Sequence, residues 1–142
     1  MTQISINLWA VLGSGVASMV VGGLWYSPVL FGKTWMHLMG FTAETMQKQK
    51  SKAMRGYVVA FLASLVMSYV LAHFLTYAMT YSHSFGVKAG LMGGFWLWLG
   101  FFFPVTLGSF LWENKPFKLF LINVSHYLAS LLVMSAILAK WM

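Results

Sequence analysis

Four long apolar stretches constrain this chain more than any other feature of its sequence. They run from about residue 6 to 29, 56 to 80, 88 to 111 and 117 to 139. A helix needs about 20 mostly apolar residues to cross the roughly 30 Å hydrocarbon core of a bilayer, and each stretch is long enough. Only 8% of the residues are charged, too few to cover the surface of a water-soluble domain. We therefore predict an all-α integral membrane four-helix bundle, a single transmembrane domain over residues 1–142.

Basic residues are distributed unevenly between the connections of these four spans. The segment 31–55 and the connection between spans three and four hold seven of the nine, Lys33, Lys48, Lys50, Lys52, Arg55, Lys115 and Lys118. The opposite side holds Lys88 and Lys140. Lysine and arginine collect on the cytoplasmic side of membrane spans. We therefore expect segment 31–55 in the cytoplasm and both termini outside, and this topology explains the positive charge without a nucleic acid partner.

The segment 31–55 has the pattern of two helices at the membrane surface. Apolar residues recur at helical spacing before Gly40, which can end the first, amphipathic helix. Thr42 can cap a second helix that continues toward span two. This helix carries four cations that can bind anionic lipid headgroups or serve only to fix the topology. They are Lys48, Lys50, Lys52 and Arg55.

A motif at the end of span one is similar to a known family signature. Residues Trp25 to Trp35 read WYSPxLFGxxW, which resembles the signature of small bacterial membrane proteins known as domain of unknown function 1761. The glycine- and tryptophan-rich span three, the 111–116 stretch LWENKP, and Asn123, His126 and Tyr127 in span four are similar to further positions of that family. The resemblance implies a four-span fold in a bacterial cytoplasmic membrane, and it implies no activity.

The WYSP motif itself has two interpretations. Pro28 lacks a backbone N–H and biases Ser27 toward an extended conformation, so span one should end or kink there. Trp25 and Tyr26 then act as interfacial anchors beside a helix stop, or the unwound corner offers carbonyl groups to a ligand. Glu113, at the same predicted membrane face, either pairs with lysines in solvent or reaches this corner.

Polar residues at intervals of three and four mark one face of span four. Asn123, His126, Tyr127 and Ser130 lie at a depth where polar groups must point into the bundle or into water. They form either an interhelical hydrogen-bond clamp or the polar lining of a solute or proton path. In span two, His73 belongs to an aromatic row that we expect to border a pocket or a neighbouring subunit. Small residues at four-residue spacing, among them Gly90 and Gly94, favour close helix packing.

The sequence offers little for catalysis. It contains neither cysteine nor aspartate, and no phosphate loop, nucleophile elbow or metal-binding pattern. We therefore expect no enzyme activity, no metal and no cofactor. The leading hypothesis is a homo-oligomeric transport or channel-like protein for a small solute or ion of unknown identity. The alternative is a structural or accessory membrane protein that binds lipid or a partner membrane protein.

Overall fold

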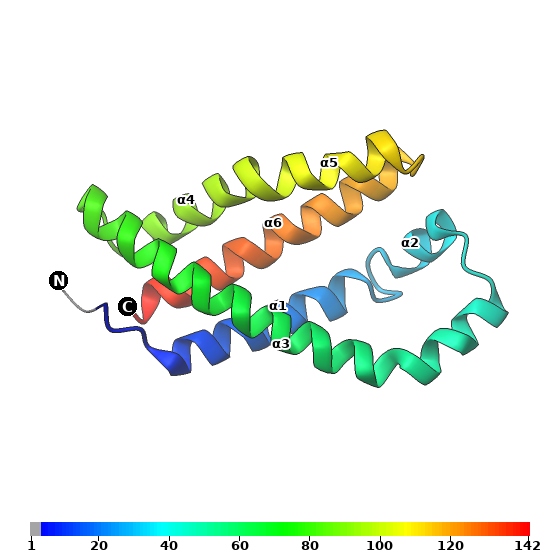
Figure 1. Cartoon of the computed structure of the whole chain (residues 1–142), viewed down its shortest axis with the longest axis horizontal. Helices are drawn as coiled ribbons and strands as arrows, with labels where there is room; N and C mark the ends of the chain where they lie inside the picture. Colours follow the sequence, from blue (N-terminus) through cyan, green and yellow to red (C-terminus); the bar gives the residue numbers. More distant parts are fainter. Residues whose placement is uncertain (1–3) are drawn as a thin grey trace.

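The computed structural model describes residues 4–142, and within this range every regular element is helical (Figure 1). Four helices are long and apolar enough to cross a membrane, which confirms the predicted all-α four-helix architecture. One of the four is continuous from Val87 to Trp112 and comprises three of the labelled elements. The elements are α1 (Leu8–Trp25), α2 (Gly32–Met39), α3 (Ala43–Ser82), α4 (Val87–Leu97), η1 (Trp98–Phe102), α5 (Phe103–Trp112) and α6 (Phe117–Lys140).

Helix α6 is the central element of the bundle. It packs against α1 on one side and against α4 and α5 on the other, while α3 crosses the bundle at an angle (Figure 1). Both termini lie at one end, where the Asn7 side-chain amide donates to the Trp141 carbonyl over 3.3 Å. Helix α2 and the loop 113–116 lie at the opposite end. The two termini therefore share one side of the bundle, as an even number of crossings requires.

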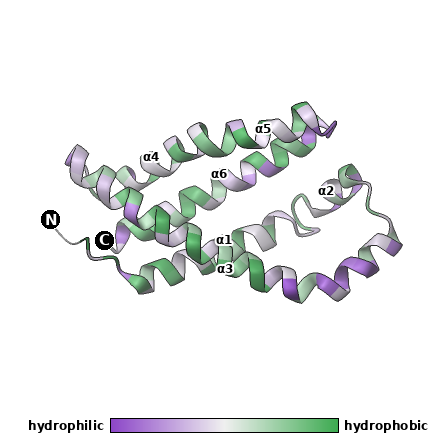
Figure 2. Cartoon of the chain, viewed as in Figure 1, coloured by the Kyte–Doolittle hydropathy of each residue, from purple (hydrophilic) through white to green (hydrophobic). Residues whose placement is uncertain are grey.

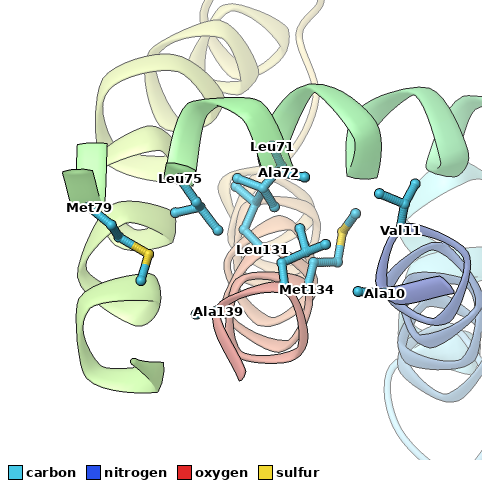
Figure 3. Packing of buried hydrophobic residues seen from close by; sticks show 10 residues of the cluster. Ala10, Val11, Leu71, Ala72, Leu75, Met79, Leu131, Met134 and Ala139 are labelled. Carbon is cyan, nitrogen blue, oxygen red and sulfur yellow. The ribbon is translucent and has the colours of Figure 1, made fainter. Parts of the chain in front are cut away.

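The hydrophobic core occupies the half of the bundle nearer the termini. Its largest fully buried side chains include Leu75, Leu131, Met134 and Leu138, which come from α3 and α6. The start of α1 completes the cluster through residues such as Val11 (Figure 3). Burial of each large side chain stabilises the packed state through dispersion contacts, which remain favourable where lipid replaces water as the solvent. This half of the bundle therefore holds the largest fully buried apolar side chains, together with the buried hydroxyls of Ser14, Ser68 and Ser135.

Small residues let the helices approach closely in the same half. Gly90 and Gly94 are buried against α6, and a Cβ added at Gly94 would overlap the Ser135 side chain and lie 3.1 Å from the Leu131 carbonyl oxygen. The predicted glycine seam of span three is therefore confirmed as a packing surface. Between α1 and α3, the Ser68 hydroxyl donates to the Val11 carbonyl over 2.8 Å.

The helix boundaries after span one follow the predicted capping residues. Gly40 ends α2 in the left-handed conformation, with φ of 72°. Thr42 precedes α3, and its hydroxyl oxygen accepts a hydrogen bond from the Thr45 amide over 3.3 Å. With 40 residues, α3 is about 60 Å long, roughly twice the thickness of the hydrocarbon core. Its first turns are hydrophilic and extend away from the bundle (Figure 2).

Pro104 changes the helix that contains it. A proline inside a helix often produces a kink, and here the structure has a five-residue π-helical turn, η1, immediately before α5. The Phe103 amide bonds the Trp98 carbonyl, five residues back, and Pro104 then occupies the first turn of α5. A proline is tolerated there because the first turn of a helix does not need its N–H. The wider turn thus accommodates the proline within a continuous helix.

Candidate functional site

A partly open cavity of about 640 Å³ lies in the half of the bundle nearer α2. Helices α1, α3 and α6 border it together with η1. The polar lining residues are Ser18, Tyr26, Ser64, His126, Tyr127 and Ser130. The apolar and aromatic lining includes Met19, Tyr57, Met67, Phe102 and Leu131. Three of the four residues predicted on the polar face of span four therefore line one cavity.

His126 lies at the centre of an aromatic cluster beside this cavity. Its ring centroid is 5.1 Å from that of Tyr26, 5.4 Å from that of Tyr127 and 6.4 Å from that of Trp25. Its Nε2 atom lies 3.3 Å from the Ser130 hydroxyl, and its buried Nδ1 atom has no partner among the described residues. An unpaired polar atom buried in this way is rare in folded proteins.

Gly22 leaves room for this imidazole. A Cβ atom added there would lie 3.3 Å from His126 Nε2, closer than ordinary van der Waals contact. The glycine therefore allows the ring to approach the α1 backbone and keeps that side of the cavity open. This contribution of Gly22 was not predicted from the sequence.

Three consecutive residues of α6 accept hydrogen bonds from side chains of neighbouring elements. The Tyr26 hydroxyl donates to Asn123 Oδ1 over 2.8 Å. The Trp25 indole N–H donates to the Ile122 carbonyl over 3.0 Å, and the Trp98 indole N–H donates to the Val124 carbonyl over 2.8 Å. We call these three bonds the α6 clamp. Asn123 therefore belongs to an interhelical clamp, whereas His126, Tyr127 and Ser130 line the cavity.

The WYSP corner is closed by its own backbone hydrogen bonds. The Ser27 carbonyl accepts from the amides of Leu30 and Gly32, and the Trp25 carbonyl accepts from Phe31 over 3.0 Å. The Ser27 hydroxyl donates to the Leu24 carbonyl over 2.7 Å. Pro28 is exposed in this turn. Span one does end here, as predicted, but the carbonyls of Trp25 and Ser27 already have backbone partners.

The remaining predicted site residues lie away from the cavity. Glu113 is exposed, and the polar side chains of the WYSP corner bond to Leu24, Ile122 and Asn123, so the alternative in which Glu113 reaches this corner is not seen. His73 Nδ1 lies 2.9 Å from the Tyr69 carbonyl oxygen on the surface of α3. The four cations of the basic stretch, Lys48, Lys50, Lys52 and Arg55, are all exposed near the start of α3.

Sequence reasoning missed several cavity and clamp residues. Tyr57, Met67 and Phe102 carried no polar pattern that would single them out. Trp98 carried a usable signal, because a tryptophan deep in a membrane span needs an acceptor for its indole N–H. Trp96, two residues earlier, is 61% exposed and could not be distinguished from it by spacing.

Acidic side chains are absent from the cavity lining. The two acids of the sequence, Glu44 and Glu113, lie at the start of α3 and beyond α5. Residues 4–142 contain no group of three histidine or acidic side chains that could hold a metal ion. The cavity therefore presents hydroxyl, imidazole and aromatic groups to a ligand, without a fixed negative charge.

The fold and the cavity describe a small helical protein of the multi-pass membrane type. The chain belongs to the family described as "Protein of unknown function (DUF1761)", whose model matches residues 9–139. No curated protein and no solved structure matches the chain.

Proposed function

We propose that the protein binds a small amphipathic solute in the cavity beside His126 and carries it across the membrane as a homo-oligomeric transport protein. The cavity carries this proposal, because it lies against the polar face of α6. Its volume of about 640 Å³ is within the range of about 300–1,000 Å³ that is typical of ligand pockets. Apolar walls with a few convergent polar groups are also typical of such pockets.

The asymmetry of the bundle supports a carrier rather than a simple pore. The packed core around Leu75 and Met134 occupies the half nearer the termini, while the partly open cavity of about 640 Å³ lies in the other half. A carrier exposes its site to one side at a time, and this arrangement corresponds to one of the two states. The basic residues favour placing the open half on the cytoplasmic side of a bacterial cytoplasmic membrane.

The chemistry of the lining indicates which solutes fit. A cation would find no carboxylate partner in the cavity, so we propose neutral or anionic solutes with an aromatic or apolar part. Hydroxyl and imidazole groups can donate to such a solute, and the rings of Tyr26 and Tyr127 can pack against it. The lining supplies no acid to orient His126 as a base, which favours binding and transport over catalysis.

The test uses purified protein reconstituted into liposomes. Uptake is measured for the neutral solute phenyl β-D-glucoside, the anion benzenesulfonate and the cation putrescine, with protein-free liposomes as the reference. We expect uptake of at least one of the first two probes and none of the cation. Gly22→Leu, whose side chain would fill the cavity beside His126, should abolish this uptake. The matched control Gly56→Leu, at a position with open space around it, should transport normally.

The alternative is a structural or accessory protein, and a specific observation favours it. Residues on α3, α4 and α5 expose apolar surface that a partner or lipid can cover. If folded protein moves none of the probes and Gly22→Leu behaves like the wild type, the transport proposal fails and this alternative replaces it.

A further inference from the structure

A second cavity borders Trp25 at the α2 end of the bundle, which carries most of the cations. Its volume is about 420 Å³, and α6 forms one wall, while the end of α1, the turn that follows it and the start of α2 form the other. We call it the Lys118 groove. Its lining residues are Trp25, Leu30, Phe31, Thr34, Lys118, Leu121, Ile122 and Ser125.

The polar groups of this groove are suited to a phosphate. Lys118 is exposed in the first turn of α6. The side chains of Thr34 and Ser125, which carry hydroxyls, are half-buried. The Lys118 ammonium group can donate hydrogen bonds to phosphate oxygens, and the two hydroxyls can donate to phosphate or ester oxygens of a lipid. No acidic side chain lines the groove to repel an anion.

The apolar groups of the groove are suited to a hydrocarbon chain. Leu30, Phe31 and Leu121 are between 37% and 49% exposed, so their side chains face the surroundings of the protein. Trp25 contributes a ring 5.1 Å from that of Phe31, and its indole N–H is already bonded to Ile122. The polar and apolar halves thus belong to one continuous cavity.

The spacing of the lining along α6 matches a lipid at the membrane surface. Lys118 is the second residue of α6, and Ser125 lies seven positions further, about 10 Å along the axis. A span that begins at Phe117 therefore places Lys118 at headgroup level and Leu121 to Ser125 at the level of the first acyl-chain carbons. The groove follows the direction that a lipid in the same leaflet takes.

We propose that the Lys118 groove binds one anionic phospholipid, with its phosphate at Lys118 and an acyl chain against Leu30, Phe31 and Leu121. This site is separate from the cavity beside His126 and from the basic stretch Lys48 to Arg55. It holds a lipid through a defined pocket rather than through the general attraction between cations and an anionic surface.

The test counts lipids bound to purified, detergent-solubilised protein by native mass spectrometry. Dioleoylphosphatidylglycerol is titrated against dioleoylphosphatidylcholine, and sodium phosphate and glycerol 3-phosphate are added as soluble competitors. We expect one phosphatidylglycerol per chain with higher affinity than phosphatidylcholine. Lys118→Gln should lower the affinity for phosphatidylglycerol about fivefold, which is the effect of removing one cation at a headgroup. Lys115→Gln, three residues earlier and outside the groove lining, should change this affinity less than about twofold.

Two results would overturn the proposal. Equal weakening by Lys118→Gln and Lys115→Gln would indicate diffuse electrostatics, and displacement by millimolar sodium phosphate would indicate a site for free anions. Leu121→Trp tests the apolar half and keeps the proposal testable if Lys118→Gln does not fold. Its larger side chain should reduce phosphatidylglycerol binding while leaving helicity unchanged, and unaltered binding would exclude the acyl-chain contact.

Discussion

The hydrogen bond from Tyr26 to Asn123 provides the sharpest test of how α1 is held against α6. Tyr26→Phe removes the hydroxyl and leaves Asn123 Oδ1 without the donor that lies 2.8 Å away. This distance is the usual one for an O–H···O bond, and both residues are half-buried. Side-chain bonds between membrane helices average about 0.6 kcal/mol and reach about 1.7 kcal/mol. The geometry places this bond in the upper part of that range, at about 1 kcal/mol.

A double-mutant cycle isolates this contribution. Tyr26→Phe, Asn123→Ala and the double variant are unfolded by exchanging a mild detergent for sodium dodecyl sulfate, and helicity is followed by circular dichroism. Each single change should destabilise the protein, and the double variant should be about 1 kcal/mol more stable than the sum of the two predicts. Tyr77→Phe, on the exposed face of α3, is the matched control and should have little effect. Additivity within about 0.3 kcal/mol would refute the hydrogen bond as a stabilising contact.

Three further changes test the packing around α6 and are measured in the same unfolding assay unless stated. Gly94→Leu forces a side chain into Ser135 and should cost about 1–3 kcal/mol. Gly56→Leu, at a position with open space around it, should cause little loss of stability. Equal losses for the two variants would contradict close packing of Gly94 against α6. Trp98→Phe removes the donor to Val124 and should cost about 1 kcal/mol, so unchanged stability would argue against the bond. Pro104→Ala restores an N–H donor and should convert η1 into α-helix, detected as slower amide hydrogen exchange over residues 98–104; unchanged exchange would mean that the proline does not cause the π-helical turn.

The helices were predictable from the sequence because the bilayer imposes a length and an apolar composition on each crossing. The boundaries at Gly40 and Thr42 were predictable as well, since capping depends on local backbone chemistry. The extension of α3 to 40 residues followed from the absence of a helix-breaking residue between Thr42 and span two. These features require no knowledge of how one helix rotates against another.

The site was only partly predictable, because it depends on how the helices are rotated against one another. Spacing placed Asn123, His126 and Tyr127 on one face of α6, but it could not assign Asn123 to a clamp and the other two to a cavity. That division depends on where Tyr26 lies, and its position follows from the rotation of α1 against α6. The WYSP motif indicated the end of a helix, yet it gave no sign that Trp25 and Tyr26 point at α6 rather than into the membrane interface.

The size of the side chains at the contacts with α6 differs between the two ends of the bundle. The distance between two packed helices depends on the side chains at their contact. Near the termini these are small, as at Gly90 and Gly94, so α4 approaches the backbone of α6 closely. Toward α2 the hydrogen-bonded contacts with α6 are made by the large side chains of Trp25, Tyr26 and Trp98. Such large rings cannot pack as uniformly as the small residues near the termini, and the cavity beside His126 lies at this end of the bundle.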